Sequence, residues 1–210
     1  MTEAEWLTST DVKLMLSWLR DKTSDRKLRL FMAACARTLR EAFGAEQERV
    51  AEIHERLADG KVSKDEEIRF FTPDFLLQAL YPNGLIPPGS TLPLPPVWDS
   101  ANSAAITATE FTHLDPRDNT EAEKASICNL LRDVTGNPFR SVSVNSSWQS
   151  LTVLAIAQAI YEERRFSDLP ILADALEEAG CSNAEILAHC RGLGPHVRGC
   201  WVIDTILGKV

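Results

Sequence analysis

The chain has 210 residues, of which 44% are hydrophobic and 25% charged, a composition typical of an ordinary folded protein. Its formal net charge of −8 and pI near 5.1 do not favour nucleic-acid binding, because a phosphate backbone repels an acidic protein unless basic residues gather on one face. The first residues lack the basic start of a signal peptide, and no apolar stretch reaches the roughly 18 residues of a membrane span. We therefore expect a cytoplasmic protein without a membrane segment.

Residues 5–60 predict an array of short helices. Apolar residues in 12–19 recur at helical spacing after Ser9-Thr10-Asp11, which offers N-cap oxygens. A second helix is predicted to begin at Ser24, and a third to run over 45–58 before an Asp-Gly pair ends it. These helices make up a predicted N-terminal helical layer.

The middle of the chain predicts an extended segment. Five prolines occur within ten residues, Pro87, Pro88, Pro93, Pro95 and Pro96. Proline withholds the amide that helices and sheets require, so we expect residues 82–98 to form an extended loop. We interpret it as a strap packed across its own domain; a peptide ligand for an aromatic groove is the alternative. The predicted organisation is a helical layer over 1–81, this strap, and a helical bundle over 99–210.

The C-terminal half predicts further helices. One is expected to follow Thr120 and stop at Gly136, and another to follow Ser167 and stop at Gly180. Residues 148–164 are apolar around most of a helical circumference, so we expect a buried central helix there. Val142–Val144 is the only strand candidate and is too short to indicate a sheet. The predicted fold class is all-α, with eight to ten mostly short helices.

The stretch from residue 181 to 204 holds most of the residues that could perform chemistry. Helices are predicted over 184–191, after Ser182-Asn183, and over about 197–207. On the second helix, His196, Cys200 and Asp204 have i, i+4, i+8 spacing and should lie on one side. A triad on one helix cannot converge, because Asp204 lies about 12 Å along the axis from His196. We therefore assign no catalytic residue, and an orienting carboxylate would have to come from elsewhere in the chain.

Three interpretations of this stretch remain open. The one we favour is structural, with the cysteines packed as small hydrophobic groups. The second is a zinc site drawn from Cys181, His189, Cys190, His196 and Cys200, since zinc takes four tetrahedral nitrogen and sulfur ligands. The cysteine spacings match no known zinc motif. The third is a thiol nucleophile at Cys200 with His196 as its base, or an anion pocket at the glycine-containing turn.

Basic residues supply candidate anion-binding or partner-binding positions. Arg191 and Arg198 flank the glycine-containing turn, whereas Arg26, Lys27 and Arg29 lie in the opening turns of the second predicted helix. Cations near a helix N-terminus are slightly unfavourable, which would favour an anionic partner there. The alternative is a solvated face paired with nearby carboxylates.

Several motifs carry a resemblance. Residues 131–140 (LRDVTGNPFR), 159–164 (AIYEER), 169–176 (LPILADAL) and 194–201 (GPHVRGCW) resemble those of an uncharacterised bacterial family with many paralogues in planctomycetes. The opening residues TEAEWL and SDRKLRLF are similar to the start of the same family. The resemblance implies a bacterial protein but no activity, cofactor or site.

The sequence thus favours a cytosolic helical protein–protein interaction or regulatory module that binds an unidentified protein and has no catalysis of its own. This interpretation depends on well-formed helices, an acidic composition and the lack of a catalytic motif of recognised spacing. The alternative is a zinc-binding or thiol-dependent enzyme that uses the C-terminal cysteines and histidines.

Overall fold

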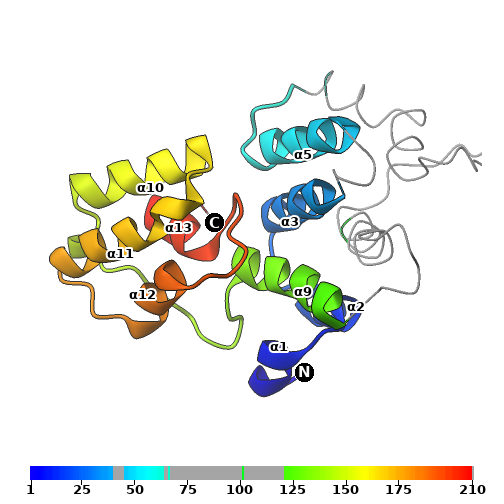
Figure 1. Ribbon diagram of the computed structural model, residues 1–210, viewed down its shortest axis with the longest axis horizontal. Helices are drawn as coiled ribbons and strands as arrows, with labels where there is room; N and C mark the ends of the chain where they lie inside the picture. Colours follow the sequence, from blue (N-terminus) through cyan, green and yellow to red (C-terminus); the bar gives the residue numbers. More distant parts are fainter. Residues whose placement is uncertain (40–44, 64–65, 67–100, 102–120, 210) are drawn as a thin grey trace, which may run out of the picture. The chain divides into compact units, whose positions relative to one another are not determined.

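The protein is described by a computed structural model covering residues 1–39, 45–63, 66, 101 and 121–209 (Figure 1). The chain divides into two compact units, Met1–Cys128 and Asn129–Val210. All regular elements in the described ranges are helices, which confirms the all-α prediction. None of these helices is long and apolar enough to cross a membrane.

The N-terminal unit begins with short capped helices. Its described helices are α1 (Glu3–Thr8), α2 (Val12–Leu19), α3 (Asp25–Thr38) and α5 (Ala45–Ala58), followed by the first residues of α9 (Glu121–Thr135). Asp11 caps α2 and Ser24 caps α3, each accepting a hydrogen bond from a backbone amide, as the sequence predicts. Helix α1 was not predicted, although Thr2 and Glu5 form a complete capping box for it.

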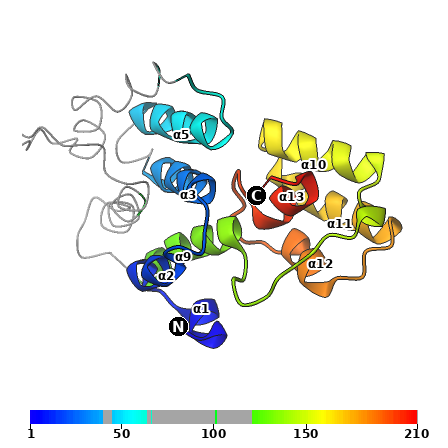
Figure 2. The ribbon, with the colours of Figure 1, turned by 180° about the vertical axis from the view of Figure 1, so that it is seen from behind.

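Helices α3 and α5 lie side by side in both views of the ribbon (Figures 1 and 2). Arg26 at the start of α3 pairs with Asp59 beyond the end of α5, so the two helices run antiparallel. Ala33, Ala36 and Ala51 are buried between them, and these small side chains allow close approach.

The C-terminal unit consists of the end of α9 and a closed set of helices. After α9 come the short 3₁₀ helices η1 (Ser146–Trp148) and η2 (Phe166–Asp168) and the helices α10 (Leu151–Glu163), α11 (Leu169–Glu178), α12 (Ala184–Arg191) and α13 (Trp201–Leu207). Helix α10 contacts α11 and α13, and α12 also contacts both. The four helices therefore enclose one core.

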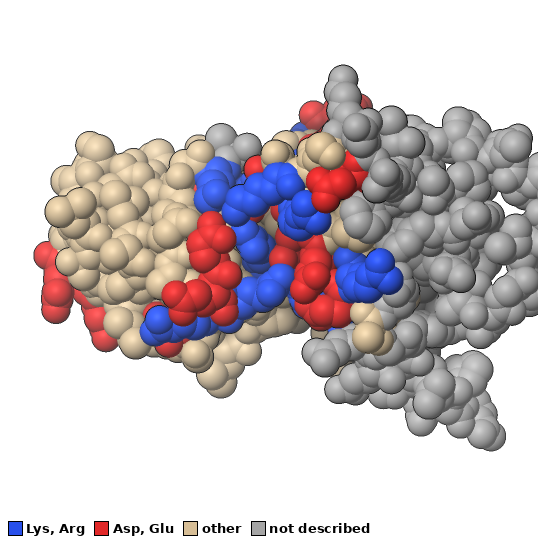
Figure 3. Space-filling view, turned by 90° about the horizontal axis from the view of Figure 1, so that it is seen from above, with Lys and Arg blue, Asp and Glu red and all other residues tan. Residues whose placement is uncertain are grey.

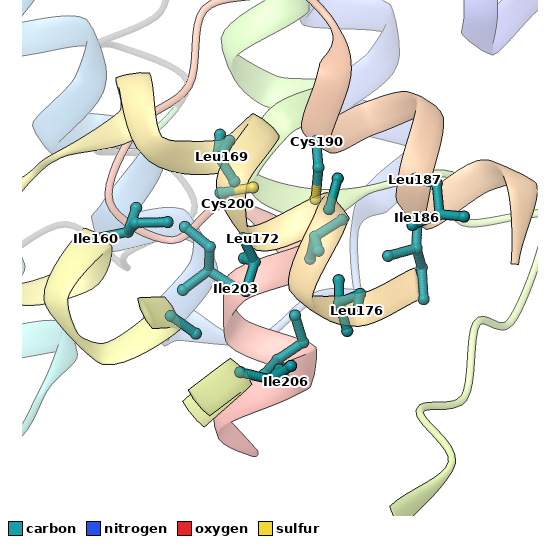
Figure 4. Packing of buried hydrophobic residues seen from close by; sticks show 14 of the residues in the cluster. Ile160, Leu169, Leu172, Leu176, Ile186, Leu187, Cys190, Cys200, Ile203 and Ile206 are labelled. Atoms are coloured by element: carbon teal, nitrogen blue, oxygen red, sulfur yellow. The ribbon is translucent and has the colours of Figure 1, made fainter. Parts of the chain in front are cut away.

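That core is aliphatic and includes buried thiols. Leu172, Leu176, Ile160 and Ile203 have no more than 1% of their surface exposed. Figure 4 shows Cys190 and Cys200 among these leucines and isoleucines. All five cysteines of the chain are buried, and none of them forms a disulfide bond.

Element boundaries agree with the sequence where local signals are strong. Helices α5 and α12 have the predicted bounds, and Asn183 caps α12. Helix α9 stops before Gly136, whose φ of 72° is readily adopted only by glycine. The predicted strap at 82–98 lies outside the described residues.

Helix α10 corrects one expectation. Residues 148–164 were predicted to be buried on nearly all sides, but the helix begins only at Leu151, whose side chain is 88% exposed. Its buried face is limited to Val153, Ala157, Ile160 and Tyr161. Ser150 is the N-cap of α10. The residues just before it form a separate 3₁₀ turn, η1, which is capped by Asn145. Residues 142–144 form no strand.

The last helix corrects a second expectation. It was predicted to begin near residue 197, but α13 begins at Trp201 and Cys200 is its N-cap residue. Gly199 has a φ of 96°, which a right-handed helix cannot accommodate. His196 and Cys200 therefore do not lie on one helical stripe, and a loop sets their positions instead.

Candidate metal site

The buried end of α9 supplies a carboxylate to the C-terminal unit. Asp133 has only 4% of its surface exposed. It shares a helix face with Leu130, three residues earlier, which is also buried. Its Oδ2 accepts a hydrogen bond of 2.9 Å from the backbone amide of Val197. That bond fixes the carboxylate, so Oδ1 faces the loop after α12.

Two histidine side chains lie close to Oδ1 of Asp133. Nδ1 of His196, in the loop between α12 and α13, lies 2.9 Å from it. Nε2 of His189, in the last turn of α12, lies 3.2 Å from it. The two rings are edge-on to each other, with centroids 4.9 Å apart. Asp133 therefore brings both histidines to one point.

The thiol of Cys200 completes the group. Its Sγ lies 3.1 Å from Nε2 of His189, and the residue has no exposed surface. The four side chains Asp133, His189, His196 and Cys200 each offer a ligand atom, and these atoms all lie within 4.8 Å of one another. Bonds of about 2.0–2.3 Å to a tetrahedral zinc ion would place neighbouring ligands about 3.3–3.8 Å apart. Small movements would therefore suffice to enclose an ion.

Two further contacts orient the rings. Nε2 of His196 lies 3.2 Å from the carbonyl oxygen of Gly192, so this ring can donate a hydrogen bond to the backbone while Nδ1 faces the group. Trp201 donates its indole N–H to Nδ1 of His189 at 3.1 Å. The indole packs against Gly136, where an added Cβ would lie 3.1 Å from Cγ of Trp201. The glycine that ends α9 thus also makes room for this indole.

The electrostatics of the group reflect burial and mutual pairing. Burial alone would raise the pKa of Asp133, but hydrogen bonds from His189 and His196 lower it below its ordinary value. Burial alone would lower the pKa of His196, but its hydrogen bond to Asp133 and the negative charge there raise it. Burial and the nearby charge of Asp133 raise the pKa of Cys200 well above that of a free thiol. Without a metal ion, Cys200 is therefore a neutral thiol at physiological pH.

Only some of the residues nominated from sequence meet here. His189, His196 and Cys200 belong to the group, whereas Cys181 and Cys190 belong to the hydrophobic core and are not among its ligand candidates. Asp204 is 1% exposed and also lies outside the group. The carboxylate does come from elsewhere in the chain, 56 residues before the first of its histidines.

Three of the five nominated cations, Arg26, Arg191 and Arg198, lie beside carboxylates. Arg26 pairs with Asp59 at 3.7 Å. The Arg191 guanidinium contacts Asp174 at 2.8 Å and Glu177 at 2.5 Å. Arg198 lies 3.4 Å from Glu162 and over the ring of Tyr161.

Lys27 and Arg29, in the first turns of α3, are partly buried. On the face in Figure 3, positive and negative side chains are intermixed. These carboxylates would compete with an external anion.

Asp133 was the residue that sequence reasoning missed. It lies in the LRDVTGNPFR motif, and a usable signal was present, because a carboxylate between Leu131 and Val134 falls on a strongly apolar part of α9. A buried carboxylate requires a partner. The histidines near the C-terminus were among the partners of suitable chemistry.

Comparison with known proteins identifies no relative. No protein-family model matches the chain, and no curated protein or solved structure matches it. Functional conclusions therefore depend on the geometry of the group itself.

Proposed function

We propose that the C-terminal unit is a metal-binding helical module, with a divalent ion held at Asp133, His196 and Cys200 beside His189. The observation that supports this proposal is the convergence of the four ligand atoms within 4.8 Å in a largely buried position. An imidazole, thiolate and carboxylate donor set suits zinc among the abundant cations, because zinc is of intermediate softness and calcium and magnesium prefer oxygen ligands.

The ion would join three separate segments of the C-terminal unit. Asp133 is near the end of α9, His196 is in the loop after α12, and Cys200 is at the start of α13. A metal bound only by the folded state stabilises that state by mass action. The role we propose is thus stabilisation of the C-terminal unit.

The arrangement gives little support to a thiol-dependent enzyme. A nucleophilic cysteine must be reachable and must ionise readily. Cys200 has no exposed surface, and burial raises its pKa well above the ordinary value. We retain the prediction that the protein is a bacterial, cytoplasmic interaction module without catalysis of its own.

Cobalt substitution tests the proposal, because a thiolate bound to Co²⁺ gives a charge-transfer absorption. The metal-free wild type should bind one Co²⁺ per chain with this band, and Cys200→Ala should lose it. Cys190→Ala is the matched control, since Cys190 is equally buried but lies outside the group. It should retain the band. A wild type that binds no cobalt, or equal loss in both folded variants, would contradict the proposal.

A further inference from the structure

The hydrogen bond between Trp201 and His189 bears on which side chains bind the ion. An indole N–H is a donor only, so Nδ1 of His189, 3.1 Å away, must be the acceptor. A neutral imidazole carries one proton, which therefore resides on Nε2. Rotating the His189 ring by 180° would place carbon atoms where Nδ1 and Nε2 now lie. The hydrogen bond from Trp201 and the contact of Nε2 with Asp133 would both be lost.

A protonated Nε2 cannot bind a metal. To become a ligand, His189 would have to move its proton to Nδ1, where it would point at the indole N–H. Two donors would then face each other at 3.1 Å in a partly buried position, with neither satisfied. Gly136, whose missing side chain makes room for the indole, lets Trp201 pack closely enough to hold this contact.

His196 is oriented differently. Its Nε2 faces the carbonyl oxygen of Gly192 and can donate to it, and without a metal its Nδ1 donates to Oδ1 of Asp133, so Nδ1 is the nitrogen that can release its proton and bind the ion. A ring N–H donated to a backbone carbonyl is the usual support of a metal-bound histidine. The neighbours of the two histidines therefore oppose metal binding at Nε2 of His189 and leave Nδ1 of His196 able to bind the ion.

We infer that His189 is not a metal ligand but a positioning residue. Its Nε2–H group donates a hydrogen bond to the ligand Cys200 or Asp133, and Trp201 holds the imidazole ring in the orientation that this requires. Nε2 lies 3.1 Å from Sγ of Cys200 and 3.2 Å from Oδ1 of Asp133, within reach of either acceptor. A hydrogen bond to a metal-bound thiolate stabilises its negative charge. The ion then has three protein ligands, and the fourth position of a tetrahedral site is left to water.

This inference rests on the proposed metal site, but one consequence can be measured without any metal. In metal-free protein labelled with ¹⁵N, long-range proton–nitrogen NMR distinguishes the protonated ring nitrogen of each histidine. His189 should carry its proton on Nε2, and Trp201→Phe should remove this restriction. A proton on Nδ1 of His189 in the wild type would overturn the inference, whether or not the protein binds a metal.

The metal-binding arm compares matched substitutions by competition titration with zinc. His189→Gln keeps an N–H donor near the Nε2 position but supplies no ring nitrogen, so zinc affinity should fall by less than about 10-fold. His189→Ala, which removes the donor, should lower the affinity by about 10–100-fold. His196→Asn should abolish tight binding, because it removes a ligand.

Trp201→Phe separates a positioning role from a ligand role. Without the indole N–H, the proton of His189 can occupy Nδ1 and Nε2 can join the ion, so His189→Gln should cost more affinity in Trp201→Phe than in the wild-type background. The inference is overturned if His189→Gln abolishes zinc binding in the wild-type background, or if its cost is the same in both backgrounds. A wild type that binds no zinc contradicts the proposed function, and the NMR result then decides the arrangement of His189 and Trp201.

Discussion

The two units bury charged groups in different ways. In the N-terminal unit, Glu55 is 3% exposed and pairs with Arg37 at 2.5 Å, and the same arginine also contacts Glu48 at 3.2 Å. In the C-terminal unit, Asp133 is equally buried, but its partners are two histidines and a backbone amide.

The difference lies in the protons of the partners. Arginine keeps its charge at any physiological pH, so Arg37 is a permanent positive partner of Glu55 and offers no lone pair to a metal ion. Histidine and cysteine can release protons and then offer lone pairs to a metal ion. A buried carboxylate thus indicates a metal site only where its partners can lose protons. The two units should therefore respond differently to zinc, to substitution and to acid.

The largest expected difference between the units is the response to zinc. At free zinc about 1,000-fold above its Kd, the C-terminal unit should gain about 4 kcal/mol of stability, while the N-terminal unit should gain none. Hydrogen exchange of peptides from 151–163 and 25–38, followed by mass spectrometry with zinc and with a chelator, measures both at once. Equal protection of both peptides would remove the distinction between the units.

Removing the permanent partner should damage only the N-terminal unit. Arg37→Ala removes a charged partner of the buried Glu55 carboxylate and should lower the free energy of unfolding by about 3 kcal/mol. The double variant Arg37→Ala/Glu55→Gln should recover part of this loss, because the charge is gone. Urea denaturation gives the values, and zinc affinity should not change. A double variant less stable than Arg37→Ala would show that the charge is not the cause.

Acid should weaken the N-terminal unit through His54. Burial, followed by the positive charge of Arg29, lowers the pKa of His54 from 6.5 to about 4. The unfolded chain therefore binds a proton at higher pH than the folded chain, and stability is lost as pH falls from 6.5 towards 4. Between about pH 7 and pH 5 the loss should be about 2 kcal/mol. Urea denaturation of wild type and His54→Gln at both pH values isolates this contribution, and equal losses would contradict it.

The smallest effect should come from the exposed side of α10. Leu151 is 88% exposed, so Leu151→Ala should change the free energy of unfolding by no more than about 0.5 kcal/mol. Leu172→Ala, in the enclosed core, is the contrasting control and should cost about 2–5 kcal/mol. Thermal unfolding of both variants tests whether the exposed side of α10 contributes less to stability than the enclosed core. A large cost at Leu151 would indicate a contact that the exposed surface does not show.

The sequence predicted the helices whose ends carry local signals. Asn183 before α12 and Gly136 after α9 act on backbone groups within a few residues, so they can be recognised without knowing the tertiary structure. The start of α13 was wrong because helical periodicity was extended across Gly199, whose positive φ depends on the path of the loop. The extent of the buried face of α10 could not be predicted either, because it depends on which helices pack against α10.

The candidate site was predictable in part. Residue type nominated His189, His196 and Cys200, but it nominated Cys181 and Cys190 equally, and these two lie in the hydrophobic core outside the group. Asp133 is 63 residues from His196, and no spacing rule links positions so far apart. The role of Trp201 required the contact between the indole and the ring, which depends on how α9, α12 and α13 pack.

The central claim is that Asp133, His196 and Cys200 hold one metal ion. Equilibrium dialysis of the metal-free protein against zinc, followed by elemental analysis, tests it most directly in wild type, Asp133→Asn and Asp204→Asn. Asp204 is a matched control because it is a buried carboxylate of the same unit outside the group. We predict one zinc ion per chain in wild type and Asp204→Asn and none in Asp133→Asn. No bound zinc in the wild type, or full binding by Asp133→Asn, would contradict the account.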